Sequence, residues 1–294
     1  MLELMPTATA AALLPLGARP VRRRLGGSDL KVWQVGPADG EPWILLHGLA
    51  STAMSWRAPL ALLRRDCRVL VPELSAHGGS LCPEGGLGVA EGAAAVLELA
   101  RSAFGDRPVN LGGISLGAWM AVRAALAQPD RVAGLMLVAA AGYRDQDWER
   151  ISRLVTIDTL ADVDRFYRVM FVRTPLLLRA GRRVFRSAYA SASVRHVLAA
   201  TQEADVYGDA ELAGLSQPVG LIWGEADGLF GLPTARLMAA AIPRSHLVVL
   251  PGCAHGLQWE QPRRFAGAFR DLQSSMNELS PLAPADGRWK LRNT

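Results

Sequence analysis

Hydrophobic and polar positions follow two alternating patterns along most of this chain. Short, nearly continuous apolar runs are typical of strands buried on both faces of a sheet, and they occupy 30–35, 43–46, 68–71, 109–111, 132–141, 219–223 and 247–250. Segments with helical spacing lie between these runs, at 51–63, 87–103, 233–241 and 262–276, and a further helix ends near Gln128. This alternation predicts an α/β fold with a mostly parallel central sheet and helices on both faces.

One segment, residues 143–214, breaks the alternation because it holds no convincing strand. Apolar residues recur there at positions i, i+3, i+4, i+7 and i+8, the spacing of an amphipathic helix, at Val163, Phe166, Tyr167, Met170 and Phe171. About 70 helical residues inserted between two strands predict a cap over the strand ends, where open α/β sheets bind ligands.

The pattern therefore divides the chain into four parts. We expect a loosely ordered N-terminal extension at 1–18, a core at 19–142 and 215–278, a helical cap at 143–214 and a C-terminal tail at 279–294. A chain of 294 residues with 50% hydrophobic residues can bury a substantial core.

Composition removes several classes of function. The net charge is +5, but the basic residues are scattered and not interleaved with aromatic residues, which disfavours a nucleic-acid partner. No apolar run approaches 18 residues, so no membrane span is expected. Three widely spaced cysteines form neither a disulfide framework nor a zinc pattern and favour a reducing, cytoplasmic location. The sequence leaves the oligomeric state open.

Candidate chemistry begins at Ser115, which lies between Gly113 and Gly117 on a predicted strand-to-helix turn. A serine flanked by glycines in this context is typical of a nucleophile elbow, whose sharp turn lifts the hydroxyl clear of the sheet. Bulky side chains at either glycine position would clash with the neighbouring backbone. Ser115 is therefore our candidate nucleophile.

A serine nucleophile needs a base, and the base needs an acid to orient it. His255 follows the 247–250 strand and Asp227 follows the 219–223 strand, so both are expected in loops at strand ends. We interpret His255 as the base and Asp227 as the acid, with Glu225 as the alternative acid.

A developing oxyanion requires two hydrogen-bond donors. The candidates are the backbone N–H groups of Leu116, directly after the nucleophile, and of Leu49, in the loop after an early strand. Gly48 would let this loop approach closely. His47 and His77 are interpreted as structural residues that transfer no proton.

These motifs together resemble the capped α/β-hydrolase superfamily over residues 25–278. The resemblance covers His47-Gly48, the segment 73–80, the Ser115 turn and the two late loops. The superfamily's second motif usually begins with Asp and has Gly before its His, whereas this chain has Glu73 and Ala76. The order Ser115, Asp227, His255 is also that of the α/β-hydrolase fold.

The resemblance implies a serine hydrolase that cleaves a carboxylic ester or lactone of a small, largely apolar molecule through an acyl-enzyme. It implies that no metal ion or organic cofactor is needed. The implied partner is a small-molecule substrate. Candidate substrate contacts are Phe166 and Met170 in the cap and Trp259 after the histidine, although cap aromatic residues more often pack against the core.

Three alternatives stay open. The segment 253–260 is similar to the corresponding loop of hydrolases that cleave C–C bonds of aromatic ring-fission products, but Ile114 and residues 49–52 depart from their pattern. An acyltransferase would use an alcohol or thiol in place of water. A ligand-binding receptor on the same fold would bind without turnover.

Arginines gather in the cap. They could hold an anionic substrate group or form a solvated polar face, the simpler interpretation, and they are Arg165, Arg168, Arg173, Arg179, Arg182, Arg183, Arg186 and Arg195.

Overall fold

The central feature of the molecule is one mixed sheet. The computed structural model describes residues 4–25, 27–75, 77, 80, 88–201 and 203–279, and within them eight strands pair in the order β1-β2-β4-β3-β5-β6-β7-β8. The strands are β1 (Arg19–Leu25), β2 (Ser28–Val35), β3 (Glu41–Leu46), β4 (Cys67–Pro72), β5 (Val109–Ile114), β6 (Val132–Val138), β7 (Val219–Gly224) and β8 (Ser245–Leu250). β2 pairs antiparallel with β1 and β4, and all other neighbours are parallel. The predicted, mostly parallel α/β fold is confirmed.

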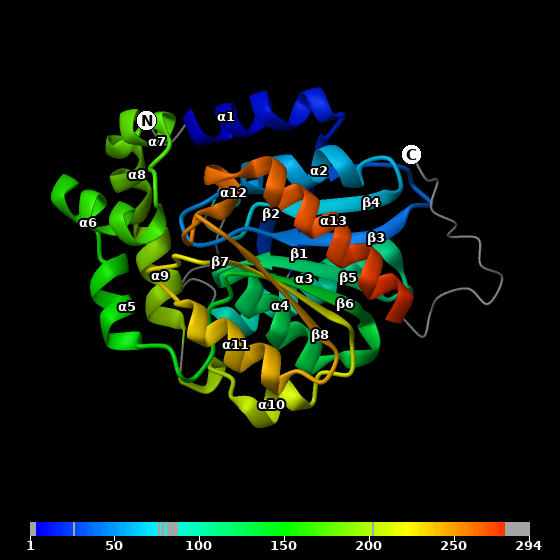
Figure 1. The fold of residues 1–294 in the computed structure, drawn as a ribbon. Coiled ribbons are helices and arrows are strands. Elements are labelled where there is room, and N and C mark those ends of the chain that lie inside the picture. The colour runs from blue at the N-terminus through cyan, green and yellow to red at the C-terminus, as the bar shows by residue number, and fades with distance from the viewer. Residues whose placement is uncertain are drawn as a thin grey trace.

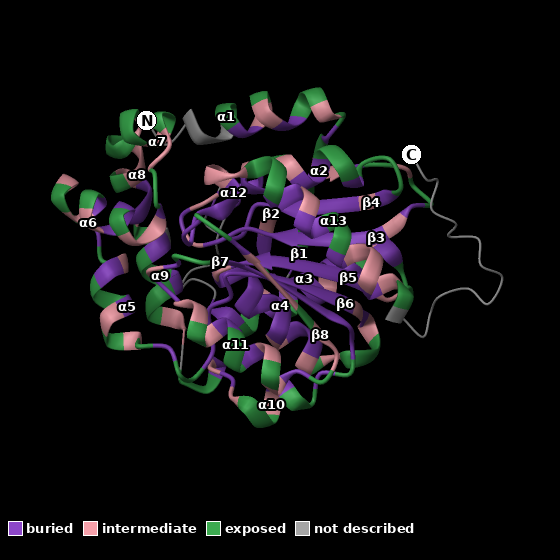
Figure 2. Cartoon of the chain, in the orientation of Figure 1, coloured by how far each residue is buried: buried purple, intermediate pink, exposed green. Residues whose placement is uncertain are grey.

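Helices cover both faces of this sheet (Figure 1). One face carries α1 (Leu4–Leu13), α2 (Arg57–Leu63) and α13 (Pro262–Leu279), together with the short η1 (Leu14–Leu16), η2 (Ala53–Trp56) and α12 (Leu257–Glu260). The other face carries α3 (Val89–Phe104), α4 (Leu116–Ala127) and α11 (Leu232–Ala241), and η3 (Pro129–Arg131) precedes β6. Every residue of β5 and β7 is buried, as the continuous apolar runs predict (Figure 2).

Two apolar cores result from this layering. On the α2/α13 side, the rings of Trp43, Trp56, Phe265 and Phe269 pack against one another. On the opposite side, α3 and α4 pack on the sheet in a core that continues into the cap. Ser115, Asp227 and His255 therefore follow strands of a sheet that helices cover on both faces.

The cap segment, residues 143–214, joins β6 to β7. Its elements are α5 (Trp148–Val155), α6 (Leu160–Met170), α7 (Leu176–Ala180), α8 (Arg182–Tyr189), α9 (Ala192–Ala200), η4 (Glu203–Asp205) and α10 (Asp209–Ala213). The expected amphipathic helix is α6, which begins at a capping box formed by Thr159 and Asp162. The division of the chain into a core and a cap stays a prediction, and we keep the name cap for residues 143–214.

The N-terminal region differs from the expected loosely ordered extension. Leu4–Leu13 form α1, Leu13 is fully buried, and the Thr9 hydroxyl donates to Thr52 Oγ1 at 3.0 Å. β1 was also not expected, because its arginines hide the apolar alternation. The rest of the predicted tail, 280–294, lies outside the described residues, as do Cys82 and Ala76.

Two further observations concern composition. Cys67 and Cys253 are buried and free among the described residues. Within the same part of the chain, no helix has both the length and the apolar character needed to cross a membrane.

Candidate active site

Ser115 occupies a strained turn between β5 and α4. Its φ of 54° and ψ of −114° lie in a region that side chains rarely adopt. The turn is held because Ser115 N–H donates to the Val138 carbonyl at 2.9 Å. A Cβ on Gly113 would lie 2.3 Å from the Ala118 nitrogen, and one on Gly117 would lie 2.4 Å from the Leu46 carbonyl oxygen. Both glycines are therefore sterically required, as the elbow motif predicts.

Asp227 and His255 meet in the loops that follow β7 and β8. Nδ1 of His255 lies 2.9 Å from Oδ2 of Asp227, and both side chains are buried. The other Asp227 oxygen accepts hydrogen bonds from the N–H groups of Leu229 and Phe230, at 2.8 and 2.9 Å. The ring of Phe230 contacts the His255 ring edge-on, 5.1 Å between centroids. The imidazole orientation is thus fixed by the carboxylate and by a neighbouring ring.

Glu225, the alternative acid, lies elsewhere. Its side chain is exposed, and Oε2 accepts a hydrogen bond from the Gly252 N–H at 3.2 Å. Since Asp227 makes the contact with His255, the structure brings Asp227, and not Glu225, to the histidine.

One candidate oxyanion donor, Leu116, directly follows Ser115, and the other, Leu49, lies in the loop after β3. Within the described part of the chain, the backbone N–H groups of Leu49 and Leu116 donate no hydrogen bond. The next residue, Ala50, has a left-handed φ of 52°, and its N–H donates to Nε2 of His77 at 3.0 Å. His77 therefore stabilises the turn that carries Leu49, which is the structural role predicted for it.

The space around Gly48 is less restricted than we expected. A Cβ there would lie 3.4 Å from the Ile114 carbonyl oxygen and 3.5 Å from Ser115 Cβ, which is ordinary contact. The close approach of the two turns therefore does not depend strictly on a glycine at this position.

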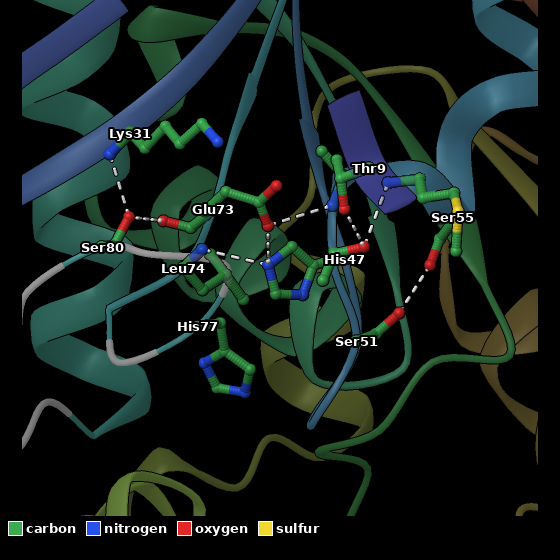
Figure 3. A network of polar contacts seen from close by, with 12 residues as sticks. Thr9, Lys31, His47, Ser51, Ser55, Glu73, Leu74, His77 and Ser80 are labelled. Atoms are coloured by element: carbon green, nitrogen blue, oxygen red, sulfur yellow. Dashed lines mark hydrogen bonds and ion pairs between the residues drawn. The ribbon is translucent and has the colours of Figure 1, made fainter. Parts of the chain in front are cut away.

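A buried polar network supports this turn from below (Figure 3). His47 Nδ1 lies 2.8 Å from the Gly48 carbonyl oxygen, and Nε2 accepts from the Leu74 N–H at 3.0 Å. Burial and the neighbouring His77 lower the pKa of His47 to about 3. A neutral ring with its proton on Nδ1 satisfies both contacts, so the 3.6 Å approach of Nε2 to Glu73 is not an ion pair.

Glu73 stands where the superfamily motif usually has Asp. It is fully buried, and its two oxygens accept from Trp33 Nε1 at 3.0 Å and from the Ala53 N–H at 3.1 Å. Burial raises the pKa of Glu73 to about 7, although both donors and Lys31 oppose this shift. The carboxyl group thus links β2 to the segment that follows the Leu49 turn, while Gly78 and Gly79 of the same motif lie outside the described residues.

The three candidate substrate contacts differ in exposure. Phe166 is 1% exposed, and its ring packs against Phe185 and Tyr189 at 5.8 and 5.2 Å, so this side chain is committed to the interior of the cap. Met170 and Trp259 are partly buried. Of the three, only these two retain surface that a substrate could contact.

A small apolar cavity lies beside Leu116. Its volume is about 20 Å³, roughly the space of one water molecule. The lining includes Leu30, Leu74, Val96, Leu99, Leu116 and Met120. Among the described residues, no group of three or more His, Cys, Asp or Glu side chains could hold a metal ion.

A model of the Alpha/beta hydrolase family matches residues 43–268. This chain belongs to that family. The resemblance found in the motifs is confirmed, and the protein is a hydrolase.

Relatives of this hydrolase include a pimeloyl-acyl-carrier-protein methyl ester esterase from Nitrosomonas europaea. It is 26% identical over 269 residues, which cover 80% of this chain and 96% of that esterase. A bacterial membrane phospholipase A has a similar structure, with a TM-score of 0.82, 21% identity and coverage of 93% of this chain and 91% of that one. A meta-cleavage product hydrolase from Pseudomonas fluorescens IP01 gives a TM-score of 0.73 at 20% identity, with coverage of 87% and 97%. Because both identities are low, these two structural similarities show a shared fold only.

Residues that the sequence analysis missed connect the cap of this hydrolase to the two late loops. The carbonyl oxygens of Val169 and Met170, at the end of α6, accept from the N–H groups of Gly228 and Gly256 at 3.2 and 2.7 Å. The guanidinium of Arg150 donates to the Gly228 and Leu229 carbonyls. These contacts lie directly beside Asp227 and His255.

Glu260 makes a second connection of this kind. Its Oε2 accepts from the Ala254 N–H at 2.7 Å, and its Oε1 accepts from the Arg173 N–H at 2.9 Å. No local sequence pattern reveals these partners, because Arg173 lies 87 positions away. Glu260 therefore joins the cap to the residue before His255.

Proposed function

We propose that this hydrolase cleaves a carboxylic ester or lactone of a small, largely apolar substrate. Ser115 would be the nucleophile, His255 the general base and Asp227 the orienting acid. The observation that carries the proposal is the 2.9 Å hydrogen bond between His255 Nδ1 and Asp227 Oδ2. Because this contact holds the proton on Nδ1, Nε2 is available to accept the Ser115 hydroxyl proton.

The reaction proceeds in two steps. The Ser115 oxygen attacks the substrate carbonyl carbon as its proton passes to His255, and the Leu49 and Leu116 N–H groups stabilise the oxyanion. When the C–O bond to the alcohol breaks, His255 returns the proton to the leaving oxygen. Water then attacks the acyl-enzyme with His255 again as base, releases the acid and restores the Ser115 hydroxyl.

One comparison supports an ester as the substrate class, because the Nitrosomonas europaea relative is named as a methyl ester esterase. The cavity beside Leu116, at about 20 Å³, is too small for an acyl group and carries no part of the proposal.

Hydrolysis of a panel of p-nitrophenyl esters of increasing chain length tests the proposal, with the wild type compared with Ser115→Ala. We expect turnover and labelling by a fluorophosphonate probe in the wild type, and a loss of activity of roughly 10³-fold or more in the variant. An unlabelled, inactive wild type would overturn the assignment of Ser115.

Two further substrates separate the alternatives. Wild type that labels but hydrolyses no ester is offered a ring-fission dienol diketone, whose bleaching would indicate C–C bond cleavage. An ester assay with added alcohol, read as transesterified product, would detect acyl transfer. Either result without ester hydrolysis would replace the proposed function.

A further inference from the structure

One stretch within the cap carries a strong local positive charge, although the cap as a whole is nearly neutral. Residues 165–202 contain eight arginines and neither Asp nor Glu, whereas the whole chain has a net charge of only +5. The remainder of the chain is therefore net negative. A charge this concentrated attracts anionic surfaces more strongly than the overall composition suggests.

Exposed leucines stand within the same stretch. Leu176 and Leu177, at the start of α7, are 79% and 77% exposed, and nearby Val172 is 51% exposed. Among the described residues, no other large apolar side chain reaches the exposure of these two leucines. Two adjacent leucines that project so far do not line a groove. Transfer of their side chains from water into an apolar environment would be favourable.

Three exposed arginines flank this tip without a carboxylate partner. Among the described residues, no ion pair involves Arg173, Arg179 or Arg183, all of which are exposed. Other cap arginines are engaged, since Arg182 pairs with Asp164 at 3.3 Å and Arg186 donates to the Asp158 carbonyl. These three arginines thus lie within six residues of the exposed leucines along the chain.

An uncharged segment reaches the same edge of the molecule. α1 contains no charged residue, and Leu14, which follows it, is 53% exposed. α1 and α7 both lie along the upper edge in Figure 1, and Figure 2 shows exposed positions on both. A flat surface laid along that edge would meet the two elements together.

We propose that this edge docks the protein peripherally on an anionic lipid bilayer. Leu176 and Leu177 enter the boundary between headgroups and acyl chains, while Arg173, Arg179 and Arg183 contact headgroup phosphates. Exposed leucines beside arginines are the combination that interfacial anchors use. An acidic protein would satisfy the arginines, but it would need a matching pocket for two projecting leucines.

Co-sedimentation with vesicles tests this proposal without reference to catalysis. The vesicles are phosphatidylcholine alone, or phosphatidylcholine with phosphatidylglycerol. We expect binding to the anionic vesicles that weakens as salt rises. The double variants L176S/L177S and R179Q/R183Q should each lower the partition coefficient by roughly tenfold or more.

The matched control is R236Q/L237S on α11, where an exposed arginine precedes a 45% exposed leucine, outside the cap and far from α7 (Figure 1). It should bind like the wild type, and circular dichroism should show all variants folded. Absence of binding to anionic vesicles overturns the proposal. So does binding that R179Q/R183Q abolishes and L176S/L177S leaves intact, because it would show electrostatic adsorption without insertion of the leucines.

Discussion

Oε1 of Glu260 accepts a hydrogen bond from the backbone N–H of Arg173 at 2.9 Å. The other oxygen accepts from Ala254, the residue before His255, at 2.7 Å. One carboxylate therefore holds the cap and the histidine loop in a fixed relation. In the proposed mechanism, the position of the imidazole depends on this contact.

We expect Glu260→Ala to lower kcat/KM for the best ester roughly tenfold, because two hydrogen bonds to a carboxylate are lost beside His255. Glu225→Ala is the control, since Glu225 also accepts a backbone N–H from this loop, that of Gly252, but makes no hydrogen bond to the cap among the described residues. Equal losses in the two variants would contradict a role for the cap contact. Steady-state kinetics and the thermal midpoint are measured for both.

Asp227→Asn should reduce kcat by roughly 10³–10⁴-fold with little change in fold. The amide oxygen would take the place of Oδ1, which accepts from Leu229 and Phe230, so the NH₂ group would face His255 Nδ1. Nδ1 would then have to accept, and the ring proton would move to Nε2, where it blocks proton removal from Ser115. Fluorophosphonate labelling rates report the same defect, and a loss below tenfold would exclude Asp227 as the orienting acid.

Gly256→Ala should reduce activity and stability together. A Cβ at this position would lie 2.1 Å from the Phe171 ring, which belongs to the cap. The ring must move, and the 2.7 Å hydrogen bond from Gly256 to Met170 is strained with it. Gly267→Ala on α13 is the control, because its Cβ would meet nothing within 4 Å and should stabilise the helix by about 0.5–1 kcal/mol. Urea unfolding and ester kinetics test both variants.

Glu73→Gln should change how stability depends on pH. The folded pKa of Glu73 is about 7 and thus above its ordinary value of 4.5. The folded state therefore binds more protons between these values, and the wild type loses stability as pH rises through this window. The stability of the wild type minus that of Glu73→Gln should increase by up to about 3 kcal/mol as pH falls from 7 to 4.5.

His47 acts in the opposite direction over part of the same range. Its folded pKa is about 3, below its ordinary value of 6.5, so its contribution to stability is lost as pH falls from 6.5 toward 3. The two effects partly cancel in the wild type, and the variant should be the more acid-sensitive protein. Urea unfolding at several pH values measures this difference, and a difference that does not vary with pH would show that Glu73 titrates normally.

The predictable part of this fold follows from local signals. The strands that precede Ser115, Asp227 and His255 contain short apolar runs and could be located from the sequence, although β8, unlike the fully buried β5 and β7, is mostly half-buried. The Gly113 and Gly117 constraints followed from turn geometry alone. These features depend on neighbours a few positions away.

The missed features depend on distant partners. The sequence pattern did not reveal β1, because an edge strand can carry exposed arginines along its length while its backbone pairs with β2. α1 has little amphipathic pattern, and it is fixed by contacts such as that of Thr9 with Thr52, 43 positions away. The role of Glu260 exists only once the cap has folded back over α12.

The position of β1 has a consequence for assembly. β1 ends the sheet, and its residues Arg22, Arg23 and Arg24 pair with β2, while no described strand pairs with the outer edge. A second molecule offering the same edge would bring two rows of guanidinium groups together. Repulsion between like charges opposes such strand addition. This edge therefore guards against β-aggregation, independently of any role in catalysis.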